Sequence, residues 1–150
     1  MTGRAFLNRI LLAIVAAIGA PAVRAADCYD QAGSFYQLSP ALLRAIAAVE
    51  SGGRLNAIGH NRNGTEDLCA MQINSAWLPT LARFGILRHH LLTHECTCVH
   101  AGAWILAGEM QSAGYSWRAV GQYHTGNNPR RAAEGHAYAW RVFQKLERVK

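Results

Sequence analysis

The stretch SPALLRAIAAVESGG, residues 39–53, predicts the fold class of the chain and the position of its most unusual side chain. It begins with Ser39, a preferred N-cap residue, and Pro40, which suits the first turn of an α-helix. It ends with Gly52 and Gly53, which commonly terminate a helix. These features predict a helix whose last turn opens into a polar segment.

Glu50 is unusual because it continues the apolar stripe of this helix. Leu43, Ile46 and Ala47 lie on one face, and Glu50 is the next position on it. Burial and the negative end of the helix dipole both raise the pKa of a carboxyl group placed there. A carboxylic acid that is protonated near neutral pH can protonate the leaving oxygen of a glycoside. The alternative is an exposed glutamate at a frayed helix end.

Four further stretches carry similar helix signals at their ends. No stretch shows strand-like alternation bounded by turn residues, apart from possible short pieces near residues 56–70. We therefore predict an all-α fold, α+β at most: a compact bundle of short helices with one long polar loop at residues 51–68. The four stretches are NSAWLPTLARFG (74–85), HECTCVHAGAWILAGEMQSAG (94–114), SWRAVGQYHTG (116–126) and NNPRRAAEGHAYAWRVFQKLERVK (127–150).

Residues 1–25 predict a secretory signal peptide. Arg4 and Arg9 precede an apolar run at residues 10–20, and small residues lead to a cleavage site at residues 23–25. A membrane anchor is the alternative, but the apolar run is shorter than the roughly 20 residues that span a bilayer. We therefore expect one exported domain at residues 26–150 with no stable membrane anchor. Its hydrophobic content of 51% for the whole chain is sufficient for a real core.

The charge of the chain favours some partners over others. Removal of Arg4, Arg9 and Arg24 with the leader lowers the formal net charge from +6 to +3. Mild positive charge suits an anionic polymer such as a cell wall. Nucleic acid is not an expected partner, because the arginines are scattered and form no basic stripe interleaved with aromatic residues.

Cysteine and histidine are concentrated in HHLLTHECTCVH, residues 89–100, which has the composition of a metal site. The chain holds four cysteines, an even number, and export favours disulfides over thiolate metal ligands. Four cysteines allow three pairings, and their spacing does not choose among them.

Three blocks of the sequence resemble the signature blocks of lytic transglycosylases, lysozyme-like enzymes that cut the glycan strands of peptidoglycan. The resemblance is closest to the small secreted branch associated with type III and type IV secretion, conjugation and type IV pili, and it covers about residues 28–146. The signature blocks are ESGG (50–53), CAMQINS (69–75) and AVGQYHTG (119–126), and NRNGTED (61–67) and GAWILAG (102–108) match that branch.

The resemblance implies a lysozyme-like fold with a substrate cleft and a reaction that needs one carboxylate. Glu50 protonates the β-1,4 glycosidic oxygen between N-acetylmuramic acid and N-acetylglucosamine, while the muramoyl N-acetyl group stabilises the developing cation. Glu50 then deprotonates the muramoyl 6-hydroxyl, which closes onto the anomeric carbon and forms a 1,6-anhydro end. No cofactor or metal is implied. The implied location is the periplasm, and the implied partners are peptidoglycan strands and components of an envelope-spanning secretion, conjugation or pilus machine.

The resemblance also implies roles for residues around the acid. Gln72 and Asn74 bind acetamido groups or brace the cleft, and Tyr123 lines the cleft. Tyr138 is similar to a family tyrosine that can hydrogen-bond the catalytic carboxylate. The whole set implied to bind substrate is Ser51, Met71, Gln72, Asn74, Tyr123, His124 and Tyr138, with helix capping as the alternative for Ser51 and core packing as the alternative for Met71.

In this branch a cysteine at the position of Cys96 accompanies one near the mature N-terminus, so the resemblance implies a Cys28–Cys96 disulfide. Cys69 and Cys98 remain as a possible second pair. The histidines of residues 89–100 then lack thiolate partners, and we expect no metal there.

The chain departs from the family pattern in two blocks. Cys69 and Ala70 replace the usual Gly-Leu, and a lost glycine matters if the backbone needs a positive φ. His124 and Thr125 replace the usual Asn-Ala. These changes leave a non-catalytic peptidoglycan-binding assembly subunit as one alternative.

A second alternative is a lysozyme-type muramidase, a hydrolase on the same fold, in which Asp67 or Glu66 holds a water. The aromatic residues do not distinguish a transglycosylase from a muramidase or from a non-catalytic subunit. We expect the tryptophans to lie in the core rather than to form sugar platforms; they are Trp77, Trp104, Trp117 and Trp140.

Overall fold

The helix predicted from residues 39–53 is α2, Pro40–Ser51, in the computed structural model, which describes residues 26–148. The Ser39 side chain caps its first turn by accepting a hydrogen bond from the Leu42 N–H. Gly52, with φ of 69°, ends it in the left-handed conformation that glycine adopts most easily. The signal peptide predicted for residues 1–25 lies outside the described residues.

The other predicted helices are present, with one of them divided. Residues 74–85 form a 3₁₀ turn, η1 (Ser75–Trp77), followed by the short helix α3 (Leu78–Ala82). Two short helices were not predicted: α1 (Cys28–Tyr36), which Asp27 caps, and α4 (Arg88–Thr93). The remaining elements are α5 (Glu95–Ala113), α6 (Trp117–Thr125), the 3₁₀ turn η2 (Pro129–Arg131) and α7 (Ala132–Glu147).

The polar segment after α2, expected as a long loop with possible short strand pieces near residues 56–70, does contain such strands. It contains two short antiparallel strands, β1 (Ile58–His60) and β2 (Glu66–Leu68), and β3 (Ile73–Asn74) pairs with the other edge of β2. Strands of two or three residues are too short to show alternation. The chain is therefore mostly helical with a small sheet, the α+β form of the predicted lysozyme-like fold.

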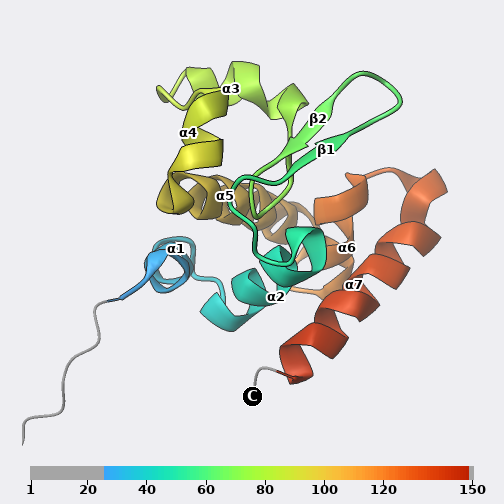
Figure 1. Cartoon of the computed structure of the whole chain (residues 1–150). Helices are drawn as coiled ribbons and strands as arrows, with labels where there is room; N and C mark the ends of the chain where they lie inside the picture. Colours follow the sequence, from blue (N-terminus) through green and yellow to red (C-terminus); the bar gives the residue numbers. More distant parts are fainter. Residues whose placement is uncertain (1–25, 149–150) are drawn as a thin grey trace, which may run out of the picture.

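Helix α5 occupies the centre of the fold, with α1, α4 and α6 packed against it and α7 packed against α6 and α2 (Figure 1). Two glycines allow α6 and α7 to approach closely. A Cβ atom added at Gly121 would lie 2.7 Å from the backbone oxygen of Gly135. The hairpin of β1 and β2 extends away from the helices on the upper side of the molecule in Figure 1.

Two disulfides join outer segments to α5. Cys28–Cys96 fastens α1, and Cys69–Cys98 fastens the turn between β2 and β3. These are the two pairs expected from the sequence. In a simple chain-entropy model, the 68-residue separation of the first pair corresponds to on the order of 4 kcal/mol of stabilisation. Within residues 26–148, no helix combines the length and the apolar character that a membrane crossing requires.

The tryptophan prediction is wrong for three of the four residues. Trp104 is partly buried against the core. Trp77, Trp117 and Trp140 are exposed by 37%, 39% and 59%, respectively. Helical position alone did not separate the buried face of each helix from its solvent face, because the neighbours of these aromatic residues include small and polar side chains.

Candidate active site

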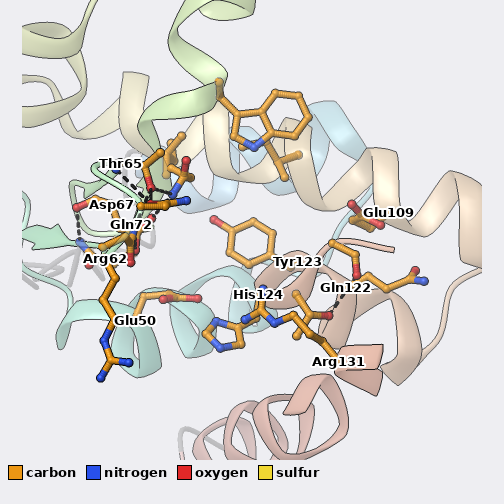
Figure 2. A pocket seen from close by; sticks show the side chains of 18 residues that line it. Glu50, Arg62, Thr65, Asp67, Gln72, Glu109, Gln122, Tyr123, His124 and Arg131 are labelled. Carbon is orange, nitrogen blue, oxygen red and sulfur yellow. Dashed lines mark hydrogen bonds between the residues drawn. The ribbon is translucent and has the colours of Figure 1, made fainter. Parts of the chain in front are cut away.

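A cleft of about 560 Å³ separates the sheet from the helices, a size typical of ligand sites (Figure 2). Asn61, Thr65, Asp67 and Asn74 line one side, and we call them the strand wall. Glu50 of α2, together with Tyr123 and His124 of α6, lines the other side, and we call these three the helical wall.

Glu50 is the carboxyl group of the helical wall. It follows the fully buried Leu43 and Ile46 on the apolar face of α2. Burial is the largest cause that raises the pKa of Glu50, from an ordinary 4.5 to about 7, and the negative charge of Asp67 adds to the rise. The Tyr138 hydroxyl donates a 2.6 Å hydrogen bond to Glu50 Oε1, which opposes the rise. The protonated and the ionised form of Glu50 are therefore both accessible near neutral pH.

Tyr138 holds Glu50 from behind the cleft surface. It is only 1% exposed, and burial raises the pKa of its hydroxyl far above the ordinary value. The imidazole of His124 stacks on the phenol ring, with centroids 4.6 Å apart and planes within 3° of parallel. The ring and its hydroxyl are thereby constrained, so Tyr138 positions the acid without contacting the open cleft.

His124 is itself held by a charged pair. Its Nε2 lies 3.2 Å from Glu134 Oε1, and both oxygens of Glu134 accept hydrogen bonds from Arg131. Arg131 lowers the pKa of Glu134 to about 2. Burial lowers the pKa of His124, and the negative charge of Glu134 opposes that effect. This position, where the family pattern has Asn, thus carries an oriented imidazole beside the acid (Figure 2).

Asp67 is the carboxylate of the strand wall, and two amide groups hold it. Asn61 Nδ2 donates to Asp67 Oδ2 at 2.9 Å, and Asn74 Nδ2 donates to Oδ1 at 2.8 Å. Thr65 Oγ1 accepts from both asparagine amides, which closes the network. The pairing of β2 with β3 sets this geometry, because Asp67 lies directly opposite Asn74 in the register.

The segment 69–72 joins the two walls. Cys69 and Gln72 both have a positive φ, 65° and 50°, so this turn does require the conformation that the usual family glycine would adopt freely. Gln72 Nε2 donates to the Cys69 carbonyl at 2.9 Å, which braces the turn. The Tyr123 hydroxyl donates to the Met71 carbonyl at 2.8 Å and connects α6 to the same turn.

Ser51 connects α2 to this segment. Its hydroxyl donates to the Ala70 carbonyl at 2.9 Å and accepts from the Arg54 N–H, and the side chain is buried. Met71 is also fully buried, and its side chain packs against Gly102 of α5, where a Cβ atom would lie 2.8 Å from Met71 Cε. Ser51 and Met71 therefore support the cleft from inside, in keeping with the capping and packing alternatives.

The structure brings five of the predicted residues to the cleft surface and places three behind it. Ser51, Met71 and Tyr138 do not line the cleft, whereas Glu50, Gln72, Asn74, Tyr123 and His124 do. Sequence analysis missed twelve lining residues, although seven of them lie in the matching blocks at residues 61–67 and 119–126. The missed residues are Asn61, Arg62, Asn63, Thr65, Ile73, Trp77, Ile105, Glu109, Gln122, Thr125, Gly126 and Arg131.

No residue of the histidine-rich stretch, residues 89–100, lines the cleft. His89 and His90 are in ring contact, with centroids 4.0 Å apart, while Cys96 and Cys98 are both bonded in disulfides. Among residues 26–148, no group of three or more His, Cys, Asp or Glu side chains has the arrangement of a metal site.

A partly buried glutamic acid in a polar cleft of a lysozyme-like fold is typical of an enzyme that cleaves glycans. The family model "Transglycosylase SLT domain" matches residues 27–142. The chain is 42% identical over 125 residues to "Invasion protein IagB" of Salmonella typhimurium, covering 83% of this chain and 78% of the relative. It is 36% identical over 129 residues to "Protein IpgF" of Shigella flexneri, covering 86% and 85%.

A third relative is "X polypeptide" of Escherichia coli strain K12, 40% identical over 128 residues, or 84% of this chain and 76% of that protein. The chain belongs to the transglycosylase SLT family. It is a peptidoglycan lytic transglycosylase, as the sequence predicted.

Proposed function

We propose that Glu50 is the one catalytic acid and base of this enzyme. The observation that carries the proposal is the burial of its carboxyl group, which raises the pKa to about 7 while Tyr138 fixes its orientation. A group with this pKa can donate a proton at neutral pH and can also accept one in a later step. In the first step, Glu50 protonates the oxygen between N-acetylmuramic acid and N-acetylglucosamine, and the glycosidic bond breaks.

The second step uses the same side chain as a base. The glycosidic electron pair leaves with N-acetylglucosamine, and the muramoyl N-acetyl oxygen stabilises the cationic anomeric carbon. Glu50, now ionised, takes the proton of the muramoyl 6-hydroxyl as that oxygen bonds to the anomeric carbon. The 1,6-anhydro product forms without water, and Glu50 returns to its protonated state.

The other cleft residues bind and orient the strand in this proposal. His124, with the imidazole nitrogen that does not face Glu134, offers a hydrogen bond to the sugar, and Gln72 and Asn74 set the shape of the opposite side. The negative charge of Asp67 faces the same space and favours positive charge developing at the anomeric carbon. Each role follows from a side chain that lines the cleft.

We also propose where the enzyme works. Two disulfides suit an oxidising compartment, and we place the mature chain in the periplasm after cleavage of residues 1–25. There it opens the wall locally for an envelope-spanning secretion, conjugation or pilus machine. The description of one relative as an invasion protein is consistent with such a role.

Product analysis tests the reaction. Purified sacculi are digested with the oxidised mature chain, and the soluble muropeptides are analysed by mass spectrometry. We expect 1,6-anhydromuramoyl ends, which are lighter by one water than reducing ends. Reducing ends alone would instead identify a hydrolase that uses a water at Asp67, and binding without released muropeptides would identify a non-catalytic subunit.

A further inference from the structure

An aromatic surface lies outside the catalytic cleft, on the solvent side of α6 and α7. We call Trp117, Trp140 and Phe143 the aromatic platform. Trp140 and Phe143 stack with ring centroids 5.3 Å apart, and Trp117 meets Phe143 edge-on at 5.4 Å. Two large indole groups are thus held in fixed relative positions while 39% and 59% of their surface faces solvent.

The fold does not require these aromatic side chains as core. Helix α7 buries Tyr138, Ala139 and Val142, and the exposed Trp140 lies away from that face. An exposed apolar group rimmed by polar residues commonly marks a binding surface. Helix α7 forms the outer edge of the molecule on one side in Figure 1, and the exposed fractions of Trp117 and Trp140 show that the platform is accessible to solvent.

Two further hollows lie between the cleft and the outer face of α7; they share lining residues with the cleft and with each other, and we call them together the depression. A second hollow, of about 600 Å³, lies between α6, η2 and α7 and shares Gln122, Thr125 and Gly126 with the cleft. A third, of about 630 Å³, contains the platform and shares Trp117 and His136 with the second. A polymer that leaves the cleft at the end of α6 can therefore follow the depression to the platform.

The charge along this path suits an anionic polymer. Arg118 and His136 line the second hollow, and Arg118 has no ion-pair partner among residues 26–148. Peptidoglycan strands carry carboxylates on their stem peptides, and their sugar rings have apolar C–H faces. An indole face accepts such C–H groups, while the guanidinium attracts a carboxylate.

We propose that the aromatic platform is a second glycan-binding surface, which holds the peptidoglycan strand after it leaves the catalytic cleft. This inference rests on the proposed function, since it takes the strand in the cleft as the occupant of the path. A sugar stacks on Trp140, Trp117 closes one side, and Arg118 pairs with a stem-peptide carboxylate. The platform thereby favours long strands over short fragments.

Binding to sacculi tests the platform separately from catalysis. Every protein carries Glu50→Gln, so that the strands stay intact, and binding is measured by co-sedimentation. We expect Trp117→Ala with Trp140→Ala to raise the apparent Kd about 10-fold. Phe35→Ala is the matched control, because Phe35 is an exposed aromatic residue, 74% exposed, on α1 and outside all three hollows. Unchanged binding by the double variant, or an equal loss in the control, overturns the proposal.

A conservative variant and a second readout guard against misfolding. Trp140→Phe keeps a flat aromatic face and is expected to recover most of the binding, and circular dichroism checks that each variant is folded. In proteins that retain Glu50, the double variant is expected to lower kcat/KM for sacculi about 10-fold relative to kcat/KM for a soluble tetrasaccharide. An equal fall for both substrates overturns the proposal.

The remaining outcomes distinguish failure of the proposed function from failure of the platform proposal. They also distinguish peptidoglycan from a membrane or a second copy of the chain as the ligand of the platform. If the wild-type chain releases no anhydro product but the double variant still loses sacculus binding, the proposed function fails and the platform stands. If the double variant loses binding to phosphatidylglycerol vesicles and keeps sacculus binding, the surface belongs to a membrane and the platform proposal is overturned. Concentration-dependent dimerisation that depends on Trp140, with sacculus binding intact, overturns it in the same way.

Discussion

The two walls of the cleft each present a carboxyl group, but they surround it with opposite chemistry. Glu50 follows an apolar helical face, and within residues 26–148 the one hydrogen-bond donor to its carboxyl group is the Tyr138 hydroxyl. Asp67 lies on a strand between two asparagines, and each of its oxygens accepts an amide N–H. The surroundings of the two carboxyl groups therefore give them different roles. Burial favours the protonated form of Glu50 on the helical wall, while amide donors hold Asp67 as a hydrogen-bond acceptor on the strand wall.

The walls also influence each other across the cleft. The charge of Asp67 raises the pKa of Glu50, whereas the hydrogen bond from Tyr138 lowers it. Two neighbours of one acid therefore act in opposite directions, and each can be removed by a nearly isosteric substitution. The pH dependence of the reaction then measures how Asp67 and Tyr138 each change the pKa of Glu50.

Replacing the acid has the largest expected effect. Glu50→Gln keeps the shape of the side chain but cannot transfer a proton, so we expect kcat/KM on sacculi to fall about 1,000-fold or more. Release of muropeptides measures the loss. Glu66→Gln is the matched control, because Glu66 lies on β2, pairs with Arg88 and does not line the cleft. Near-normal release by Glu50→Gln would remove Glu50 from the mechanism and with it the contrast between the walls.

The same substitution has a consequence for stability. The folded pKa of Glu50 lies above its ordinary value, so the stability contributed by the protonated form is present below about pH 4.5 and is lost as the pH rises through about 7. At pH 8 the wild type therefore carries a penalty on the order of 3 kcal/mol that Glu50→Gln avoids. Urea unfolding at pH 5 and pH 8 measures it, and parallel behaviour of the two proteins contradicts the buried, ionisable acid.

Position in the sequence marked Glu50 as a candidate, and the family resemblance favoured it over the alternative of an exposed glutamate, but neither identified its counterpart on the strand wall. An acidic residue that continues an apolar stripe is visible from 3.6-residue periodicity, and the structure places it where that reasoning did. Asp67 could only be named as an alternative. Its amide partners, Asn61 and Asn74, are brought to it by the pairing of very short strands, which leave no periodic signal.

Removing the charge of the strand wall has the next largest expected effect. Asp67→Asn takes away the negative charge that faces the anomeric carbon, and we expect kcat/KM to fall about 100-fold. It also removes a cause that raises the pKa of Glu50, so the alkaline limb of the pH profile should move to lower pH. Rates measured from pH 5 to pH 9 test both effects, and a limb that stays in place contradicts the coupling between the walls.

Removing the hydrogen bond to the acid shifts the profile in the opposite direction. Tyr138→Phe deletes the hydroxyl that favours ionised Glu50, so the pKa of Glu50 should rise and the alkaline limb should move to higher pH. We expect a loss of about 10-fold in kcat/KM from poorer orientation. Tyr115→Phe is the control, because its hydroxyl bonds the Gln37 carbonyl at the surface. Shifts of the same sign in Asp67→Asn and Tyr138→Phe would contradict the opposition described above.

The conformation of the segment 69–72, which joins the two walls, could be predicted from the sequence only in part. The loss of the family glycine at position 69 was expected to matter if the backbone there had a positive φ, and Cys69 does have one. Nothing local in the sequence indicated that Gln72 adopts the same conformation or that Tyr123 bonds the Met71 carbonyl. The Tyr123–Met71 hydrogen bond joins residues 52 apart in the sequence, a contact that only tertiary packing creates.

The smallest expected effect is on stability, and it is measured by comparing two double variants that alter the segment 69–72. Both lose the Cys69–Cys98 disulfide, which for a 29-residue separation corresponds to on the order of 3 kcal/mol. Cys69→Gly with Cys98→Ala adopts the positive φ without a steric penalty, whereas Cys69→Ala with Cys98→Ala retains one, so the glycine variant should be more stable by about 1 kcal/mol. Urea unfolding of the two variants measures the difference. Equal stabilities would mean that the turn relaxes once the disulfide is absent. The disulfide, rather than the backbone of the turn, would then hold the Met71 carbonyl in place for its hydrogen bond with Tyr123.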